Sequence, residues 1–200
     1  MAKKLLNNLL ILISLIFVFP AGLLCILEKR FTSGQEAYLF FSQLFSLFPG
    51  ILGKYLANSF YLYTLKEFHR DCVIRFGSVI ANPGTEIEHT VRISPNCSIG
   101  LCSIGEGTVI STNVVIMSGR RQHAFTINGL DLSRAPYFKG IRIGSKSWIG
   151  AHSLIMANVG DHCIVGAGSV VVHDIEDYSV AVGNPARVIK KLDFGTTPSQ

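Results

Sequence analysis

The sequence lacks paired cysteine motifs and carries few charges in its first third. Its five cysteines are an odd number, and none belongs to a C-x-x-C pair, so neither a disulfide framework nor a zinc ribbon is indicated. We therefore expect a reducing compartment. Residues 1–65 hold only seven charged side chains and no histidine, but eight of the thirteen phenylalanines. This change in composition predicts a hydrophobic helical region over 1–65, a second domain over 66–191 and a tail at 192–200.

The first region has no charged residue between Leu5 and Leu27. At about 1.5 Å per residue, the apolar stretch Leu9–Leu27 is roughly as long as the hydrocarbon core of a bilayer is thick. No small-residue cleavage site follows it, which argues against a signal peptide. The pattern predicts membrane attachment, and the net charge of +5 suits an anionic membrane surface without requiring nucleic acid. The alternative is a buried helical cap on a soluble protein.

Lys3 and Lys4 precede the apolar stretch and place the N-terminus inside the cell by the positive-inside rule. A second uncharged run, Ala37–Gly53, is interrupted by Pro49 and Gly50. We expect this run to return the chain through the membrane, as a hairpin, or to insert only shallowly. The second domain is then expected at the cytoplasmic face of the inner membrane.

The second domain contains an internal repeat of six residues. Neither a helix nor a simple strand has this period. A stack of triangular coils does, because each hexapeptide can form one short strand and one bend while parallel hydrogen bonds join successive coils. The aliphatic residues that would fill the centre are Ile74, Ile80, Ile87, Ile93, Ile99, Ile104, Ile110 and Ile116, with one step of seven and one of five. After an interruption the series resumes at Ile143, Ile149 and Ile155, and again at Val159, Val165 and Val171.

Small or β-branched residues follow these aliphatics by four positions. They should also point inward, so that each hexapeptide contributes two side chains to the core and the cysteines among them serve packing. This set is Ser78, Val91, Cys97, Ser103, Thr108, Val114, Ser147, Ser153, Cys163 and Ser169.

The hexads resemble those of the hexapeptide-repeat acyltransferases over about residues 72–191, most specifically over 141–191, which begin IRIGSKSWIGAH and contain GNPARVIKK. Among these the chain is similar to bacterial polysaccharide and sugar O-acetyltransferases. The resemblance implies a left-handed parallel β-helix, a homotrimer and acetyl-CoA as the acyl donor. The hand comes from the resemblance alone, because a six-residue period fixes none.

The repeat is broken once, between Gly119 and Gly140, by a loop rich in polar and aromatic residues. Loops on rigid scaffolds often carry catalytic side chains, and the resemblance places a catalytic base in a comparable excursion. The one imidazole here is His123, whose ordinary pKa of about 6.5 suits the removal of a hydroxyl proton. Arg120 and Arg121 are candidates for binding a phosphate or carboxylate of the acceptor, with a solvated basic turn as the alternative.

The resemblance also implies the remaining site residues. The backbone N–H of Ala151 would stabilise the oxyanion of the tetrahedral intermediate, and Asn96 would contact the acceptor. A solvated chain end is the alternative for the basic residues near the C-terminus, and simple packing is the alternative for the tryptophan. The coenzyme-binding candidates are Trp148, Ala151, Ala167, Arg187 and Lys190.

The six histidines do not indicate a metal site. The γ-class carbonic anhydrases share a related β-helix and place two histidine ligands five residues apart, a spacing that no two histidines have here. We therefore predict an acetyl-CoA-dependent O-acyltransferase that acts by direct transfer on a sugar hydroxyl of a polysaccharide precursor or lipid-linked saccharide. The alternatives are an N-acyltransferase of an amino sugar nucleotide and a non-catalytic, membrane-tethered assembly protein.

Overall fold

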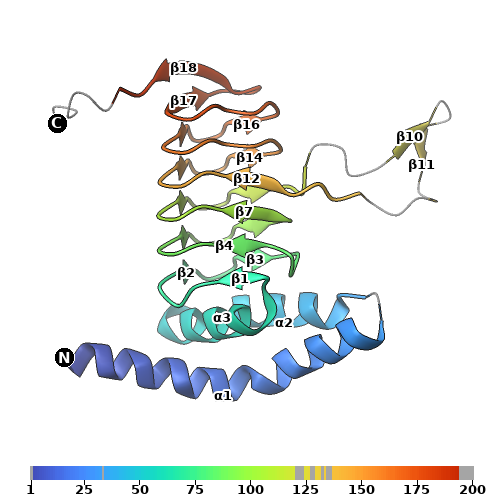
Figure 1. Ribbon diagram of the computed structural model, residues 1–200, viewed down its shortest axis with the longest axis vertical. Helices are drawn as coiled ribbons and strands as arrows, with labels where there is room; N and C mark the ends of the chain where they lie inside the picture. Colours follow the sequence, from blue (N-terminus) through green and yellow to red (C-terminus); the bar gives the residue numbers. More distant parts are fainter. Residues whose placement is uncertain are drawn as a thin grey trace.

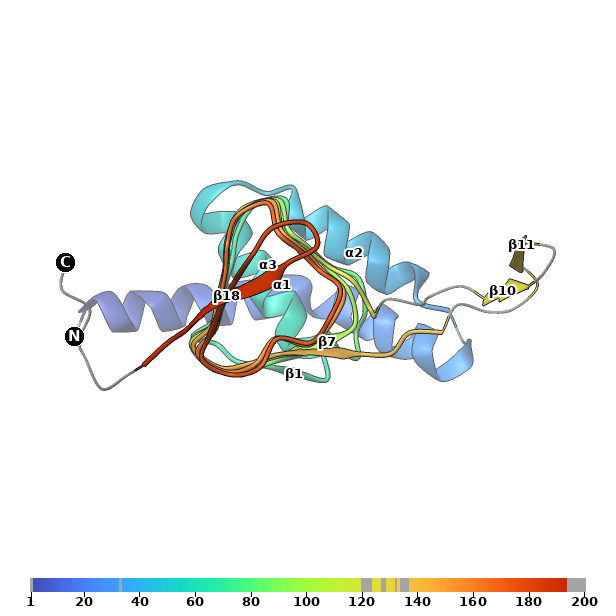
Figure 2. The ribbon, with the colours of Figure 1, turned by 90° about the horizontal axis from the view of Figure 1, so that it is seen from above.

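The computed structural model describes residues 2–32, 34–119, 124–126, 129–131, 133 and 137–193. A tall prism of short parallel strands stands on a base of three helices (Figure 1). Seen from above, the prism has a triangular outline in which successive coils superimpose (Figure 2). The stack of triangular coils predicted from the six-residue period is therefore confirmed.

Each flat side of the prism is a sheet, which we call faces A, B and C in the order in which the chain visits them. Face A contains β1 (Glu67–Phe68), β4 (Glu86–Ile87), β7 (Cys102–Ile104) and β12 (Ile141–Ile143). Face B contains β2 (Val73–Ile74), β5 (Arg92–Ile93), β8 (Val109–Ile110), β13 (Trp148–Ile149), β15 (Ile164–Val165), β17 (Ser179–Val182) and β18 (Arg187–Lys191). Face C contains β3 (Val79–Ile80), β6 (Ser98–Ile99), β9 (Val115–Ile116), β14 (Leu154–Ile155) and β16 (Val170–Val171).

The predicted central aliphatics form the core of the prism. All fourteen are at most 1% exposed. The strand register stacks them directly, as when Ile110 pairs with both Ile93 below it and Ile149 above it. Because full burial of such a side chain is worth about 1.5–3 kcal/mol, this column explains why two-residue strands are sufficient to hold each coil.

One inward position was predicted wrongly. Ser103 is only half-buried, whereas its neighbours Cys102 and Ile104 are 3% and 1% exposed. The five-residue step from Ile99 to Ile104 shortens the corner, so that β7 already begins at Cys102. Side chains alternate along a strand, and Cys102 takes the inward place that the spacing had assigned to Ser103.

The base consists of α1 (Ala2–Phe31), α2 (Glu36–Ser46) and α3 (Gly50–Thr64). Helices α2 and α3 pack on the first coil, and α1 crosses beneath α3, across the foot of the prism (Figure 1). Among the described residues, one segment, Asn8–Phe31 of α1, is long and apolar enough to cross a membrane. Residues 37–53, expected to return through the membrane as a hairpin or to insert shallowly, form most of α2, a short connection and the start of α3, and both helices pack on the first coil.

Polar side chains of the cap replace the missing neighbour of the lowest strands. The N–H of Ile80 donates to Tyr61 Oη (3.2 Å), and Ser42 Oγ donates to the Ile80 carbonyl (3.1 Å). Since Ser42 uses its own proton there, Tyr61 must donate to Ser42 Oγ (2.8 Å), which closes a ring of three bonds. Asn58 Nδ2 similarly donates to the Cys72 carbonyl (2.7 Å) beside β2. The backbone N–H and C=O groups at the lower edges of β2 and β3, which have no strand below them, therefore bond to side chains of the cap.

Candidate active site

A single excursion leaves the prism at the corner between faces C and A. The chain departs after β9 and returns at β12, and between them β10 (Ala124–Thr126) pairs with β11 (Gly129–Asp131) in an antiparallel hairpin. The hairpin projects outward from this corner (Figure 2). At its stem, Gly119 has φ +91°, and a Cβ there would lie 2.8 Å from the Lys139 carbonyl oxygen. Glycine is needed because the two stems approach so closely.

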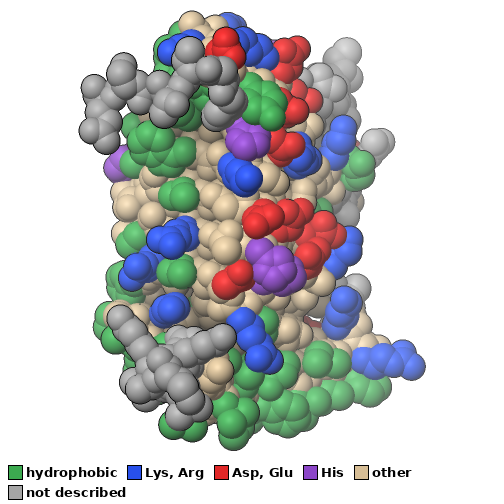
Figure 3. Space-filling view, turned by 60° about the vertical axis from the view of Figure 1, so that its left-hand side comes forward, with side chains coloured by type: hydrophobic (Ala, Val, Ile, Leu, Met, Phe, Trp, Pro, Cys, Tyr) green, Lys and Arg blue, Asp and Glu red, His purple; other side chains and the backbone are tan. Residues whose placement is uncertain are grey.

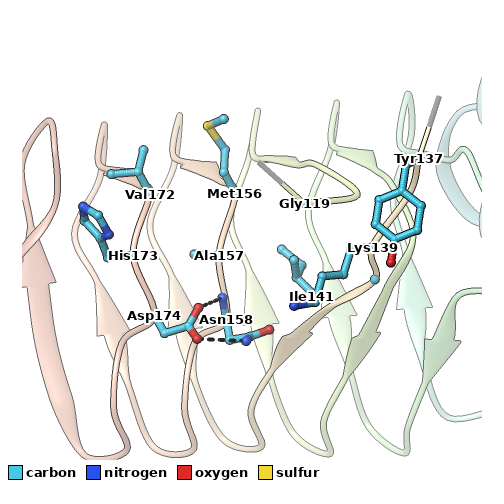
Figure 4. A pocket seen from close by; sticks show the side chains of 11 residues that line it. Gly119, Tyr137, Lys139, Ile141, Met156, Ala157, Asn158, Val172, His173 and Asp174 are labelled. Carbon is cyan, nitrogen blue, oxygen red and sulfur yellow. Dashed lines mark hydrogen bonds between the residues drawn. The ribbon is translucent and has the colours of Figure 1, made fainter. Parts of the chain in front are cut away.

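A groove of about 680 Å³ lies at the same corner, above the stem of the excursion (Figure 4). It is lined by residues of the stem and of the two coils above it. They are Gly119, Tyr137, Lys139, Gly140, Ile141, Met156, Ala157, Asn158, Val172, His173 and Asp174. Sequence reasoning did not predict this groove, since its lining comes from four separate segments that meet only through the stacking of coils.

The polar residues at the floor of the groove hold neighbouring coils together. Asp174 accepts hydrogen bonds from the backbone N–H of Asn158 (2.9 Å) and from its Nδ2 (3.1 Å), and Asn158 Oδ1 accepts from the Arg142 N–H (2.8 Å). This carboxylate and this amide therefore have structural partners already. His173 borders the same groove at its upper edge, and its side chain is exposed (Figure 4).

The predicted oxyanion donor lies at a different corner, between faces B and C. The N–H of Ala151 has no acceptor among the described residues, although its neighbours are bonded: Gly150 N–H donates to the Val165 carbonyl and His152 N–H to that of Thr112. The amide of Ala151 is thus held rigidly by its neighbours and is still free to donate. That is the arrangement which oxyanion stabilisation requires.

The corner position of Ala151 recurs in every coil. It is followed by a residue with positive φ, His152 (59°), just as Pro95 is followed by Asn96 (59°) two coils below. Proline and alanine therefore occupy equivalent places on the same corner. The N–H at this position makes no contribution to the coil itself, because the coil with Pro95 forms without it.

The three remaining coenzyme candidates, beyond the two alanines, lie on the outer side of face B. Trp148 on β13 is 53% exposed, and its Nε1 donates to Ser111 Oγ (2.9 Å). Arg187 and Lys190 lie on β18, which pairs antiparallel with β17 at the top of the face, and both side chains are exposed. Neither is paired with an acidic side chain among the described residues. Ala167 lies one coil above Ala151, at the same corner.

Asn96 also lies at the corner between faces B and C, two coils below Ala151. Its positive φ gives a local reason for asparagine at this position, independent of any role in binding, since asparagine tolerates positive φ better than most residues. The same column contains Asn113, whose Nδ2 lies 3.3 Å from His152 Nε2. Sequence reasoning did not single out this asparagine–histidine pair beside Ala151, because the residues are far apart in the chain and meet only by stacking.

The candidate residues are therefore divided between two parts of the prism. The excursion leaves from the corner opposite face B, whereas Trp148, Arg187 and Lys190 lie on face B and Ala151 at its border with face C. Arg120, Arg121 and His123 lie outside the described residues; His123 directly precedes β10 in the sequence. The described geometry does not bring the excursion and the coenzyme candidates together within one chain.

Comparison with known proteins identifies the fold. The chain is 25% identical to the polySia specific acetyltransferase NeuO, with a TM-score of 0.52 over 66% of this chain and 64% of that one. A maltose O-acetyltransferase from Clostridium difficile 630 shares the fold, with 24% identity and a TM-score of 0.51 over 77% of this chain and 83% of that one. By fold and sequence similarity, the chain groups with the hexapeptide-repeat acyltransferases. Its β-helix is accordingly left-handed.

Curated sequences agree with this assignment. The galactoside O-acetyltransferase of Escherichia coli K12 is 36% identical over 94 residues, which cover 46% of this chain and 44% of that protein. The chain spans 28%, 44% and 66% of the length of three curated acetyltransferases that it matches. No family model matches the sequence.

Proposed function

We propose that the protein transfers an acyl group, most simply acetyl, from coenzyme A to a sugar hydroxyl. The observation that carries this proposal is the unpaired N–H of Ala151 on a rigid corner beside exposed Trp148, in a prism interrupted only by the excursion that contains His123. The similarity to a galactoside O-acetyltransferase supports a hydroxyl acceptor.

In this mechanism the imidazole of His123 accepts the proton of the acceptor hydroxyl as the oxygen attacks the thioester carbonyl carbon. The N–H of Ala151 donates a hydrogen bond to the oxyanion that forms there. When the carbon–sulfur bond breaks, the imidazolium returns its proton to the leaving thiolate. The acyl group thus passes directly to the sugar, and the histidine ends the cycle neutral.

The donor would occupy the outer side of face B. Trp148 offers an exposed ring near the reacting end, and Ala151 and Ala167 offer a flat backbone surface at the corner. Exposed Arg187 and Lys190 supply the positive charge that a diphosphate and a 3′-phosphate need. Arg120 and Arg121 on the excursion, together with Asn96 on the corner column, would bind the acceptor.

The site is proposed to form between two copies of the chain. The hairpin β10–β11 projects away from its own prism (Figure 2), and the corner that it leaves from is opposite face B. A cyclic homotrimer would let each excursion reach the Ala151 corner of the next subunit. Each of the three sites would then combine His123 from one chain with Ala151 and Trp148 from its neighbour.

The first test compares two substitutions at the corner between faces B and C. Ala151→Pro removes the N–H while keeping a residue that Pro95 shows to be compatible with this place, and we expect kcat to fall about 10²–10³-fold. Thr112→Pro, at the same corner position one coil below, is the matched control and should leave kcat unchanged. Equal activity of the two variants in an acetyl-CoA thioester-cleavage assay would remove Ala151 from the mechanism.

The second test concerns the base. His123→Ala should lower kcat about 10²–10⁴-fold, whereas His89→Gln, at the corner between faces A and B, should retain activity. If sites are shared, mixing inactive His123→Ala and Ala151→Pro chains in equal amounts restores about a quarter of the wild-type activity, because random assembly rebuilds that share of the sites in a ring. A mixture that stays inactive argues for sites within single chains.

The acceptor is proposed to be a polysaccharide precursor or lipid-linked saccharide at the cytoplasmic face of the membrane. Assays should compare such saccharides with an amino sugar nucleotide as acceptors. Faster transfer to the amine would replace this proposal by N-acylation. Absence of acetyl-CoA binding by calorimetry would instead favour a non-catalytic assembly protein.

A further inference from the structure

Helix α1 carries two stripes, and one of them fastens it along the foot of the prism. The side chains of Ser14, Val18, Ala21 and Cys25 are all buried, at the spacing of one helix face. They face α3 and α2: Ser14 Oγ lies 2.6 Å from Ser59 Oγ of α3, and Cys25 lines a cavity with Tyr38 of α2. This stripe extends for about 16 Å, so α1 is held lengthwise and not by one end.

The opposite stripe of α1 is apolar and faces away from the protein. Its large side chains are between 42% and 79% exposed, and no charged residue occurs between Leu9 and Leu27. Soluble proteins rarely expose a contiguous apolar patch of this extent unless the patch is an interaction surface. The stripe consists of Leu9, Leu12, Ile13, Ile16, Phe17, Phe19, Leu23, Leu24, Ile26, Leu27 and Phe31.

Positive charge gathers at the same end of the molecule. Residues 1–75, which include the base and the first strands, contain eight basic and four acidic side chains, whereas residues 76–200 contain ten and nine. The net charge is therefore +4 around the base and +1 over the rest. Figure 3 shows Lys and Arg side chains directly above the hydrophobic band at the foot of the molecule. Basic residues bordering an apolar face are what an anionic lipid surface attracts.

We infer that the outer stripe of α1 docks the protein on an anionic membrane leaflet, with α1 lying in the plane of the membrane and not across it. A crossing helix would have to leave α3, which would break the Ser14–Ser59 contact and expose the inner stripe. Docking in the plane keeps these contacts and buries the outer stripe at the boundary of headgroups and acyl chains. Helix α3 and the connection before it add exposed apolar side chains at the same foot, including Leu47, Ile51 and Leu52.

This orientation stands the prism upright on the membrane. In the proposed trimer with parallel prisms, all three apolar stripes would lie in one plane, as a single flat surface requires. Trp148 is three rungs above β2 in face B, about 14 Å higher, and two helix layers of about 8–10 Å each lie beneath. If the proposed function holds, a lipid-linked acceptor must therefore reach roughly 30 Å from the bilayer surface, which favours an oligosaccharide over a single lipid-linked sugar.

Vesicle binding tests the docking surface. Wild-type protein should bind vesicles of phosphatidylcholine mixed with phosphatidylglycerol more tightly than vesicles of phosphatidylcholine alone. The double variant Ile16→Glu with Phe17→Glu should bind at least about tenfold more weakly, because charge is costly in the apolar layer. The control is Ile189→Glu at the far end of the prism, since Ile189 is 65% exposed and Ile16 is 68% exposed. Equal binding by the two variants, or no preference for phosphatidylglycerol, would overturn the inference.

Cysteine labelling distinguishes an α1 that lies in the plane of the membrane from an α1 that crosses the bilayer. The five native cysteines are buried, so single cysteines introduced as Asn8→Cys and Thr32→Cys report on the two ends of the apolar segment Asn8–Phe31 of α1. On docked protein, a membrane-impermeant maleimide added outside should label both. Protection of one end would show that α1 spans the bilayer, and a drop in oligomeric mass for the Ile16→Glu, Phe17→Glu variant in detergent would show that the stripe joins copies of the chain.

Thioester cleavage in detergent separates this inference from the proposed function. The docking variant should keep that activity while losing vesicle binding, and His123→Ala should do the opposite. Tryptophan fluorescence also tests how far Trp148 lies from the bilayer, because Trp148 is the only native tryptophan. Brominated lipids should quench an added Phe17→Trp and leave Trp148 unaffected; quenching of Trp148 in the wild type contradicts the upright orientation.

Discussion

The substitution Tyr61→Phe removes one hydroxyl from the ring of hydrogen bonds that closes the lower edge of β3. The Ile80 carbonyl keeps two donors, Ser42 Oγ at 3.1 Å and Tyr38 Oη at 2.9 Å. The Ile80 N–H loses its acceptor, and because both residues are fully buried, water cannot replace it. Burial also raises the pKa of Tyr61, so the wild-type phenol stays protonated and can donate and accept at once.

We expect Tyr61→Phe to destabilise the first coil by about 1–3 kcal/mol, the cost of a buried donor without a partner. That range corresponds to roughly a 5- to 150-fold increase in the opening equilibrium of β3. Because each coil contacts only its neighbours, the upper coils, such as the one with β15, should be little affected. Hydrogen exchange measured by mass spectrometry resolves the two regions.

Tyr63→Phe is the matched control, since Tyr63 lies on the same helix and is 37% exposed. A surface change of this kind should stay within about 0.5 kcal/mol. If peptides containing Ile80 exchange equally fast in both variants, the ring does not stabilise the base and the reasoning is wrong.

Two further predictions follow from local geometry. Burial raises the pKa of Cys72 to about 11 and of Cys102 to about 12. Because the thiolate is the reactive form, neither thiol should react with a small disulfide reagent at neutral pH until the protein is unfolded. Fast reaction of these thiols in the native protein would contradict their packing. Asn96, with φ +59°, should accept Gly with little loss of stability, whereas Ala should cost about 1–2 kcal/mol. An Asn96→Gly variant that melts like the wild type but has a raised KM for the acceptor would show that the amide contacts the acceptor, and an unchanged KM would exclude that contact.

Local spacing was enough to predict the coils. Each aliphatic of the series reaches the centre because its own hexapeptide makes one strand and one bend, and this depends on residues only a few positions away. The single error, Ser103, arose at the five-residue step, where the length of one corner decides which side chain of β7 turns inward. The boundaries of the excursion were equally visible, since the repeat stops at Gly119 and resumes after Gly140.

The candidate site was only partly accessible to such reasoning. Residue types and resemblance could nominate His123, Ala151 and Trp148, but not their corners, because the corner that a hexapeptide occupies depends on every earlier slip in the count. The groove beside His173 and the pair of Asn113 with His152 arise from stacking of coils that are distant in sequence. No local pattern encodes them.

The sequence by itself determined the prism, its aliphatic centre and the place where the chain leaves it, because these depend on short-range periodicity. Only the tertiary structure decided that the excursion and the Ala151 corner lie apart, and that α1 lies along the foot of the prism. Hydropathy could not decide the latter, since a crossing helix and a helix packed lengthwise are both apolar. Contacts such as Ser14 with Ser59 decide it, because they join segments that only folding brings together.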